Sequence, residues 1–199
     1  MHTDVRFELA HKELVRRAIE ATGRLDVYIN NAGYSEWRPI EEIDDTFLDH
    51  IIATNLKGAF WGCKAALSEM KNGGCIINIS SIASKRGSAN NSAYVATKFG
   101  MNGLTQSLAK EFGAQGVRVN GVCPVLIPTD GLLQALKSPF SPARGFGEDF
   151  IANFALENAA LKRLPSGSEV AAVCIFLASE AASAITAQNI NVDCGVFPQ

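Results

Sequence analysis

Tyr94 and Lys98 are the residues of this chain whose types and spacing first suggest chemistry. On a helix, two side chains four positions apart lie one turn apart on the same face. An ammonium beside a phenol favours the phenolate and lowers the tyrosine pKa from about 10 toward neutrality, as a general acid or base requires. Such a pair is also common on solvated helices, so the spacing alone does not establish a site.

Two other polar residues stand where chemistry could use them. Ser81 follows an apolar segment that is typical of a buried strand, so its hydroxyl can face a pocket. Asn55 interrupts an apolar-rich stretch of a predicted helix, although asparagine is a poor helix former. A surface or interhelix hydrogen bond would explain Asn55 equally well, so that alternative stays open for this residue taken alone.

The elements that must position these residues follow from hydrophobic periodicity. Helices are predicted over residues 5–22, 44–71, 92–112, 149–161 and 168–177, and strands over 25–30, 75–79, 117–122 and 189–192. This alternation predicts an α/β fold with a doubly wound parallel sheet and helices on both faces. We expect one domain, because no linker or internal repeat is visible.

Three polar segments follow predicted strands: residues 30–33, Ser80 with Ser81, and the loop after Val122. In open parallel sheets, ligands bind at the carboxyl ends of the strands. The sequence therefore predicts that these segments converge on one site.

The order and spacing of these motifs resemble the classical short-chain dehydrogenases/reductases. The residues that carry the resemblance are Asn-Asn-Ala-Gly at 30–33, Asn55, Ile-Asn-Ile-Ser-Ser ending at Ser81, Tyr94-x-x-x-Lys98, Arg118-Val119-Asn120 before Pro124, and Asn191-Val192-Asp193. The resemblance runs from about Asp4 to the C-terminus. It implies that residues 1–199 form a single Rossmann-type domain that binds NAD or NADP.

The resemblance also implies roles for the residues. Tyr94 would be the acid/base, and Lys98 would bind the nicotinamide ribose and lower the Tyr94 pKa. Ser81 would hydrogen-bond the substrate oxygen, and Asn55 would anchor a water of a proton relay behind Lys98. The cofactor cleft would be lined by Asn31, Ala32, Gly33, Tyr94, Lys98, Ile127 and Thr129.

By the same resemblance, the reaction is hydride transfer between NAD(P)(H) and a secondary alcohol or ketone. A lid at about 128–165 would cover the substrate. It carries four aromatic and three cationic side chains: Phe140, Phe146, Phe150, Phe154, Arg144, Lys162 and Arg163. These residues could form an apolar wall with a cation for an acidic group, or the aromatics could simply pack the lid onto the core.

The match departs from the family at three places. No glycine-rich turn precedes Asn30, so the first two βα units and the residue that selects NAD or NADP are expected to be missing. The edge of the strand at 25–30 would then lie open. Val125 stands where the family has glycine, which disfavours a positive φ and suggests another loop path. Cys194 also replaces a glycine, a change expected to be tolerated near a subunit contact.

Two function hypotheses follow from the first departure. We favour an incomplete copy of a working enzyme, because every catalytic position is present. The alternative is a catalytically incompetent truncated form that serves as an oligomerisation or binding module. The helices at 44–71 and 92–112 would join subunits in this family, so a homodimer or homotetramer is expected.

Composition excludes several other classes. The chain has 199 residues with 18 basic and 20 acidic side chains, a formal net charge of −2, which argues against a nucleic-acid partner. No apolar run is long enough to span a membrane and no signal pattern is visible, so we expect a cytoplasmic protein. The five cysteines lack metal-ligand or disulfide spacing and are expected to be free core thiols. A Ser81 hydrolase is disfavoured, because no nucleophile elbow is present.

Overall fold

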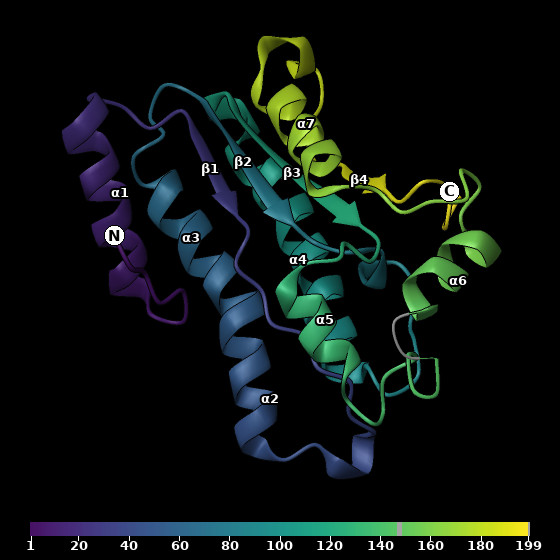
Figure 1. The fold of residues 1–199 in the computed structure, drawn as a ribbon. Helices are drawn as coiled ribbons and strands as arrows, with labels where there is room; N and C mark the ends of the chain where they lie inside the picture. Colours follow the sequence, from purple (N-terminus) through teal and green to yellow (C-terminus); the bar gives the residue numbers. More distant parts are fainter. Residues whose placement is uncertain (147–148, 199) are drawn as a thin grey trace.

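A computed structural model describes residues 1–146 and 149–198, and in them four parallel strands form one sheet. The strands pair in chain order: β1 (Val27–Asn30), β2 (Gly74–Ile79), β3 (Val117–Pro124) and β4 (Asn189–Val192). The α-helices are α1 (Glu8–Thr22), α2 (Asp45–Ile52), α3 (Gly58–Leu67), α4 (Ser92–Phe112), α5 (Asp130–Leu136), α6 (Asp149–Asn158) and α7 (Gly167–Ala178). The predicted α/β architecture is confirmed (Figure 1).

Helices cover both faces of the sheet, as near-continuous apolar strands require. On one face, α1, α3 and α4 bury a core that includes Tyr28, Ile76 and Val119. On the other face, α7 packs over Cys75 and Ile77. Ile76 faces away from its two neighbours because successive side chains of a strand alternate between faces. Figure 1 accordingly shows α7 and α4 on opposite sides of the sheet.

Local capping fixes several helix ends. Gly23 ends α1 with a left-handed backbone, φ 78°, a conformation that glycine adopts easily. The Asp44 carboxylate accepts a hydrogen bond from the Phe47 amide, 2.8 Å away, and so starts α2. Ser166 and Glu169 form a capping box at the start of α7.

The predicted helix at 44–71 divides into α2 and α3 around a π-helical turn, Ala53–Lys57. Asn55 lies inside this turn with none of its surface exposed. One extra residue in a helical turn re-aims the side chains and backbone groups around it, and such turns are frequent at functional sites. The prediction of one regular helix over 44–71 is therefore wrong at Asn55, the polar residue that the sequence analysis names within it.

A buried polar ladder ties the sheet to α4. Asn30 Nδ2 donates to Asn78 Oδ1 at 2.8 Å, and Asn78 Nδ2 donates to Thr105 Oγ1 at 2.9 Å. Gly62 on α3 packs so closely that a Cβ there would lie 2.1 Å from Asn30 Oδ1. These contacts fix the end of β1, where the candidate site begins.

β1 forms one edge of the sheet that the described residues build, and it pairs only with β2 there. Val27 and Ile29 on this strand are 37% and 46% exposed. The expectation of an open apolar edge at this strand is confirmed.

Two departures from the family pattern take defined conformations. Val125 keeps a negative φ, lies 5% exposed, and its amide donates to the Val192 carbonyl at 3.3 Å. This bond extends the pairing of β3 with β4 by one residue before the chain enters the next loop. Cys194 adopts the left-handed backbone, φ 54°, that glycine takes more easily.

The five cysteines are free thiols and four of them are buried, as predicted. No helix in residues 1–146 or 149–198 is long and apolar enough to cross a membrane.

Candidate active site

The predicted site residues converge at the carboxyl ends of β1, β2 and β3. A cavity of about 1330 Å³ opens there. Seven of the predicted residues line it: Asn31, Gly33, Ser81, Tyr94, Lys98, Ile127 and Thr129. Ala32 lines only a second, smaller cavity of about 160 Å³ beside α1, and Asn55 lines neither.

Lys98 is a buried cation, with only 4% of its surface exposed. Its Nζ donates a hydrogen bond to the Ile79 carbonyl, 2.8 Å away, and lies 5.6 Å from the centre of the Tyr94 ring. Burial disfavours the charged form and lowers the pKa of Lys98 to about 8. One of the three ammonium hydrogens is thus used by the main chain, and two remain for groups in the cavity.

Tyr94 behaves differently from the sequence-based expectation. Burial raises the pKa of Tyr94 above its ordinary value, and hydrogen bonding with the Ser81 side chain only partly opposes this. The predicted lowering by Lys98 is therefore wrong for the chain without bound ligands, because loss of water around the phenol is the larger effect.

Ser81 begins a single 3₁₀ turn, Ile82–Ser84, directly after β2. Its Oγ accepts a hydrogen bond from the Ala83 amide at 3.1 Å. Because the oxygen is the acceptor in that bond, the hydroxyl hydrogen can still be donated, and Tyr94 is one partner within its reach.

Asn55 holds the loop that follows β1. Its Oδ1 accepts from the Tyr34 amide at 2.7 Å, and its Nδ2 donates to the Tyr34 carbonyl at 2.8 Å. Nδ2 also donates to Thr97 Oγ1 on α4, 3.2 Å away. The interhelix hydrogen bond that the sequence left open is thus present, together with a role in shaping the cavity wall.

The cleft residues have unequal roles. A Cβ on Gly33 would lie 3.7 Å from Asn55 Oδ1 and 3.9 Å from Lys98 Nζ, so the open side of Gly33 faces the buried amine. Thr129 Oγ1 accepts from the Leu132 amide at 3.3 Å and caps α5. The Thr129 side chain therefore already has a structural partner.

Only part of the predicted lid reaches the cavity. Phe140, Phe150 and Phe154 line it. Phe146 is 60% exposed and is outside the described lining. The predicted cations also lie elsewhere: Arg163 pairs with Glu169, Lys162 Nζ bonds the Leu156 carbonyl, and Arg144 is on the surface.

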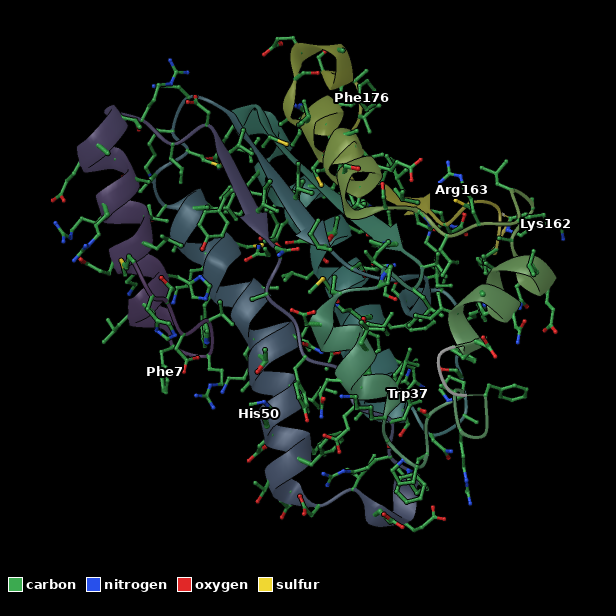
Figure 2. All side chains as sticks on the ribbon, in the orientation of Figure 1. Phe7, Trp37, His50, Lys162, Arg163 and Phe176 are labelled. Carbon is green, nitrogen blue, oxygen red and sulfur yellow. The ribbon has the colours of Figure 1, made fainter. Side chains whose placement is uncertain are left out.

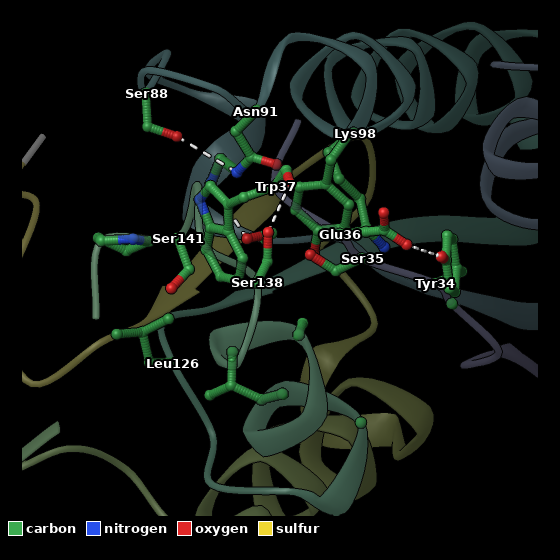
Figure 3. Close-up of a pocket in the computed structure, with 18 of the residues that line it drawn as sticks. Tyr34, Ser35, Glu36, Trp37, Ser88, Asn91, Lys98, Leu126, Ser138 and Ser141 are labelled. Carbon is green, nitrogen blue, oxygen red and sulfur yellow. Dashed lines mark hydrogen bonds between the residues drawn. The ribbon is translucent and has the colours of Figure 1, made fainter. Parts of the chain in front are cut away.

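The cavity has a second wall that the sequence analysis missed. It consists of the loop after β1, with Tyr34, Glu36, Trp37 and Arg38, and two further cations, Arg86 and Lys137. Trp37 is 6% exposed, and its carbonyl accepts from Ser138 Oγ at 2.9 Å (Figure 3). An aromatic and charged run directly after Asn-Asn-Ala-Gly is the signal that could have identified this wall.

Two of the charges within this wall, those of Arg38 and Glu36, pair with each other. Arg38 Nε donates to Glu36 Oε1 at 2.8 Å, and its guanidinium lies 4.3 Å from the centre of the Phe47 ring. The Tyr34 hydroxyl donates to Glu36, and burial together with this bond raises the pKa of Tyr34 to about 12 (Figure 3). Tyr34 therefore stays a neutral phenol at physiological pH.

The arrangement suits proton transfer at an oxygen atom. A phenol, a hydroxyl that can donate and a buried ammonium face one cavity with mainly apolar walls. The two free Lys98 hydrogens beside the open face of Gly33 match the paired hydroxyls of a ribose. The described residues thus fit the nicotinamide half of a dinucleotide.

Comparisons with known proteins agree with this geometry. A family model described as enoyl-(acyl carrier protein) reductase matches residues 1–197. The short chain dehydrogenase/reductase AstE of Aspergillus oryzae is 37% identical over 198 residues, which are 98% of this chain and 73% of the relative. The 3-oxoacyl-[acyl-carrier-protein] reductase FabG of Staphylococcus epidermidis is 34% identical and covers 94% of this chain and 72% of its own. Among solved structures, ElxO with NADP bound has a TM-score of 0.87 at 31% identity, covering 100% of this chain and 78% of its own.

Proposed function

The chain belongs to the short-chain dehydrogenase/reductase family of NAD(P)-dependent oxidoreductases, and from that premise we propose that it interconverts a secondary alcohol and a ketone. The observation that carries this proposal is that Ser81, Tyr94 and Lys98 line one cavity. When bound, the nicotinamide supplies the hydride for reduction and accepts it for oxidation.

Tyr94 moves the proton. In the reducing direction its hydroxyl gives a proton to the substrate oxygen, and in the oxidising direction it takes that proton back. Ser81 donates a hydrogen bond to the same oxygen and stabilises the negative charge that develops there. The bond from the Ala83 amide fixes the position of Ser81 Oγ for this task, and the hydroxyl hydrogen can turn from Tyr94 to the substrate oxygen.

Lys98 binds and orients the nicotinamide ribose with its two remaining hydrogens. Its bond to the Ile79 carbonyl anchors the amine. The Lys98 ammonium, 5.6 Å from the centre of the Tyr94 ring, would also favour the phenolate form of Tyr94 during proton transfer. Asn31, Gly33, Ile127 and Thr129 would complete this half of the cofactor cleft, with Ala32 on the same loop between the first two. Asn55, which lies outside this cavity, would place the relay water through the loop at Tyr34 that it holds.

The cavity wall favours a substrate with an apolar body. Four aromatic side chains contribute to that wall: Trp37, Phe140, Phe150 and Phe154. The charges of Arg38 and Glu36 in the same cavity neutralise each other in an ion pair. We further propose that the working unit is a homodimer or homotetramer, because both α3 and α4 carry half-exposed phenylalanines, Phe60 and Phe99.

The substitution Tyr94→Phe tests the central assignment. Removal of the acid/base should lower kcat for NADH- or NADPH-dependent reduction of ethyl acetoacetate by about 10²- to 10⁴-fold. Cofactor affinity, followed by nicotinamide fluorescence, should change little. Tyr28→Phe is the matched control, because that phenol lies beside His11 and away from the large cavity.

Retained turnover in Tyr94→Phe would remove Tyr94 from the mechanism. A folded wild-type chain that binds neither NADH nor NADPH would instead favour the non-catalytic binding module.

A further inference from the structure

A partly buried polar cluster lies next to Ser81 and joins α4 to the segment after β2. Its centre is Asn102, one turn after Lys98 on α4. Its other members are Ser80 and Ser84, which are 4% and 3% exposed. The proposed chemistry uses none of these three residues.

The hydrogen bonds of the cluster have a defined direction. Ser80 Oγ donates to Asn102 Oδ1 at 2.8 Å. Asn102 Nδ2 donates to Ser84 Oγ at 2.8 Å and to the Ser84 carbonyl at 3.4 Å. A carbonyl oxygen can only accept, so the NH₂ end of Asn102 must face Ser84.

The cluster continues to Ser81. The Ser84 hydroxyl donates to the Ser81 carbonyl, and the Ser84 amide donates to the same carbonyl at 2.9 Å. The Ala83 amide, in the same turn, holds Ser81 Oγ. Asn102 is thus linked to the Ser81 hydroxyl by hydrogen bonds through Ser84 and through the backbone of the 3₁₀ turn.

We propose that Asn102 is a positioning residue, which clamps residues 80–84 so that the Ser81 hydroxyl meets the substrate oxygen. This inference rests on the proposed function of Ser81. A hydrogen-bond donor works at a developing charge only when it is held close to its productive position, so the clamp acts on turnover rather than on cofactor binding.

An amide is the side chain that this position requires. Aspartate has the same shape but would set a second acceptor against the Ser84 carbonyl, and leucine would remove the bonds that Asn102 makes with Ser80 and Ser84. Gln106, one turn further along α4, is exposed and supplies a matched control.

Amide hydrogen exchange tests the clamp without any need for activity. In the cofactor-free chain, Asn102→Leu and Ser84→Ala should each speed exchange at Ala83 and Ser84 by about ten-fold or more, while Val119 in β3 and the Gln106→Leu control stay unchanged. Unchanged protection at Ala83 and Ser84 in both variants would overturn the proposal. The second variant keeps the test open should Asn102→Leu fold poorly.

A kinetic double-mutant cycle tests whether the clamp acts through Ser81. With ethyl acetoacetate, Asn102→Leu should lower kcat by about ten-fold or more and leave the KM for the nicotinamide unchanged. In a Ser81→Ala background the same change should cost nothing further. Losses that multiply would overturn the inference. A wild-type chain that shows no turnover would refute the proposed function, and the exchange data would still decide whether Asn102 holds the turn.

Discussion

Lys98 combines a catalytic assignment with a cost to stability. A buried ammonium has lost most of its water, and only the Ile79 carbonyl replaces it among the residues that the structure describes. This cost is the physical origin of the lowered Lys98 pKa of about 8. Hydrogen bonds from Lys98 to a bound ribose would therefore offset part of the cost of burying this ammonium.

The cost should be visible as a pH dependence of folding. Between pH 8 and about 10.5, the unfolded chain keeps the Lys98 proton that the native chain has released, so the free energy of unfolding rises with pH in this window. Below pH 8 both states are charged and the full cost persists. From pH 7.5 to 10.5, the wild-type free energy of unfolding should therefore gain up to about 3 kcal/mol relative to Lys98→Met. Urea unfolding of the cofactor-free proteins measures this difference, and a flat difference would show that the amine is well solvated.

At this scale the sequence predicts which residues meet but not their protonation. Tyr94, Lys98 and Ser81 share one cavity as their types and spacing indicate. The direction of the Tyr94 pKa could not be predicted, because it depends on how deeply distant segments bury the phenol. The same limit applies to cations: Arg163 was one candidate for a substrate-binding cation, and the structure pairs it instead with Glu169, six residues away.

At the scale of elements, the contact between α3 and β1 positions the start of the site. The substitution Gly62→Ala should lower the free energy of unfolding by about 2–4 kcal/mol, because the new Cβ would lie 2.1 Å from Asn30 Oδ1 and displace the bond to Asn78. Thermal or urea unfolding measures the loss.

Gly103→Ala provides the matched control for this prediction. A Cβ on Gly103, in the middle of α4, has no neighbour within 4 Å, so alanine should stabilise the helix by up to about 1 kcal/mol. Equal effects of the two substitutions would show that α3 does not pack tightly on Asn30.

Two elements of very different length were predicted with their full bounds. The helix Ser92–Phe112 and the strand Asn189–Val192 form with their predicted bounds. The π-turn at Ala53–Lys57 was missed, because the helical apolar pattern continues on both sides of Asn55. The extra residue is stabilised by Asn55 bonds to Tyr34 and Thr97, which lie outside that segment. The position of the Trp37 loop in the cavity wall likewise depends on a contact between distant segments, its bond with Ser138.

At the scale of the whole molecule, the open edge of β1 is a surface at which further strands can add. A strand edge with unpaired backbone groups and half-exposed Val27 and Ile29 is a template for aggregation. Ile29→Lys should therefore raise the protein concentration at which light scattering first appears, while the circular dichroism spectrum stays unchanged. Scattering that begins at the same concentration would show that this edge is already protected in solution.

A second apolar surface favours ordered assembly. Phe60 on α3 and Phe99 on α4 are 48% and 47% exposed, and the two helices lie on the same side of the sheet (Figure 1). Large apolar side chains on neighbouring helices are typical of a subunit contact rather than of free surface. Two other exposed phenylalanines, Phe7 and Phe176, lie away from this surface at separate ends of the molecule (Figure 2).

The substitution Phe99→Glu tests this assembly. If the α3 and α4 surface joins subunits, a buried carboxylate at position 99 should shift a dimer or tetramer to smaller species in sedimentation velocity runs at micromolar concentration. Leu9→Glu on α1, where the side chain is 76% exposed, makes the same change outside that surface and should leave the sedimentation coefficient unchanged. An oligomer that survives Phe99→Glu would move the contact away from α4. Loss of cofactor binding together with dissociation would in turn show that the packing of α4, which carries Tyr94 and Lys98, depends on the partner subunit.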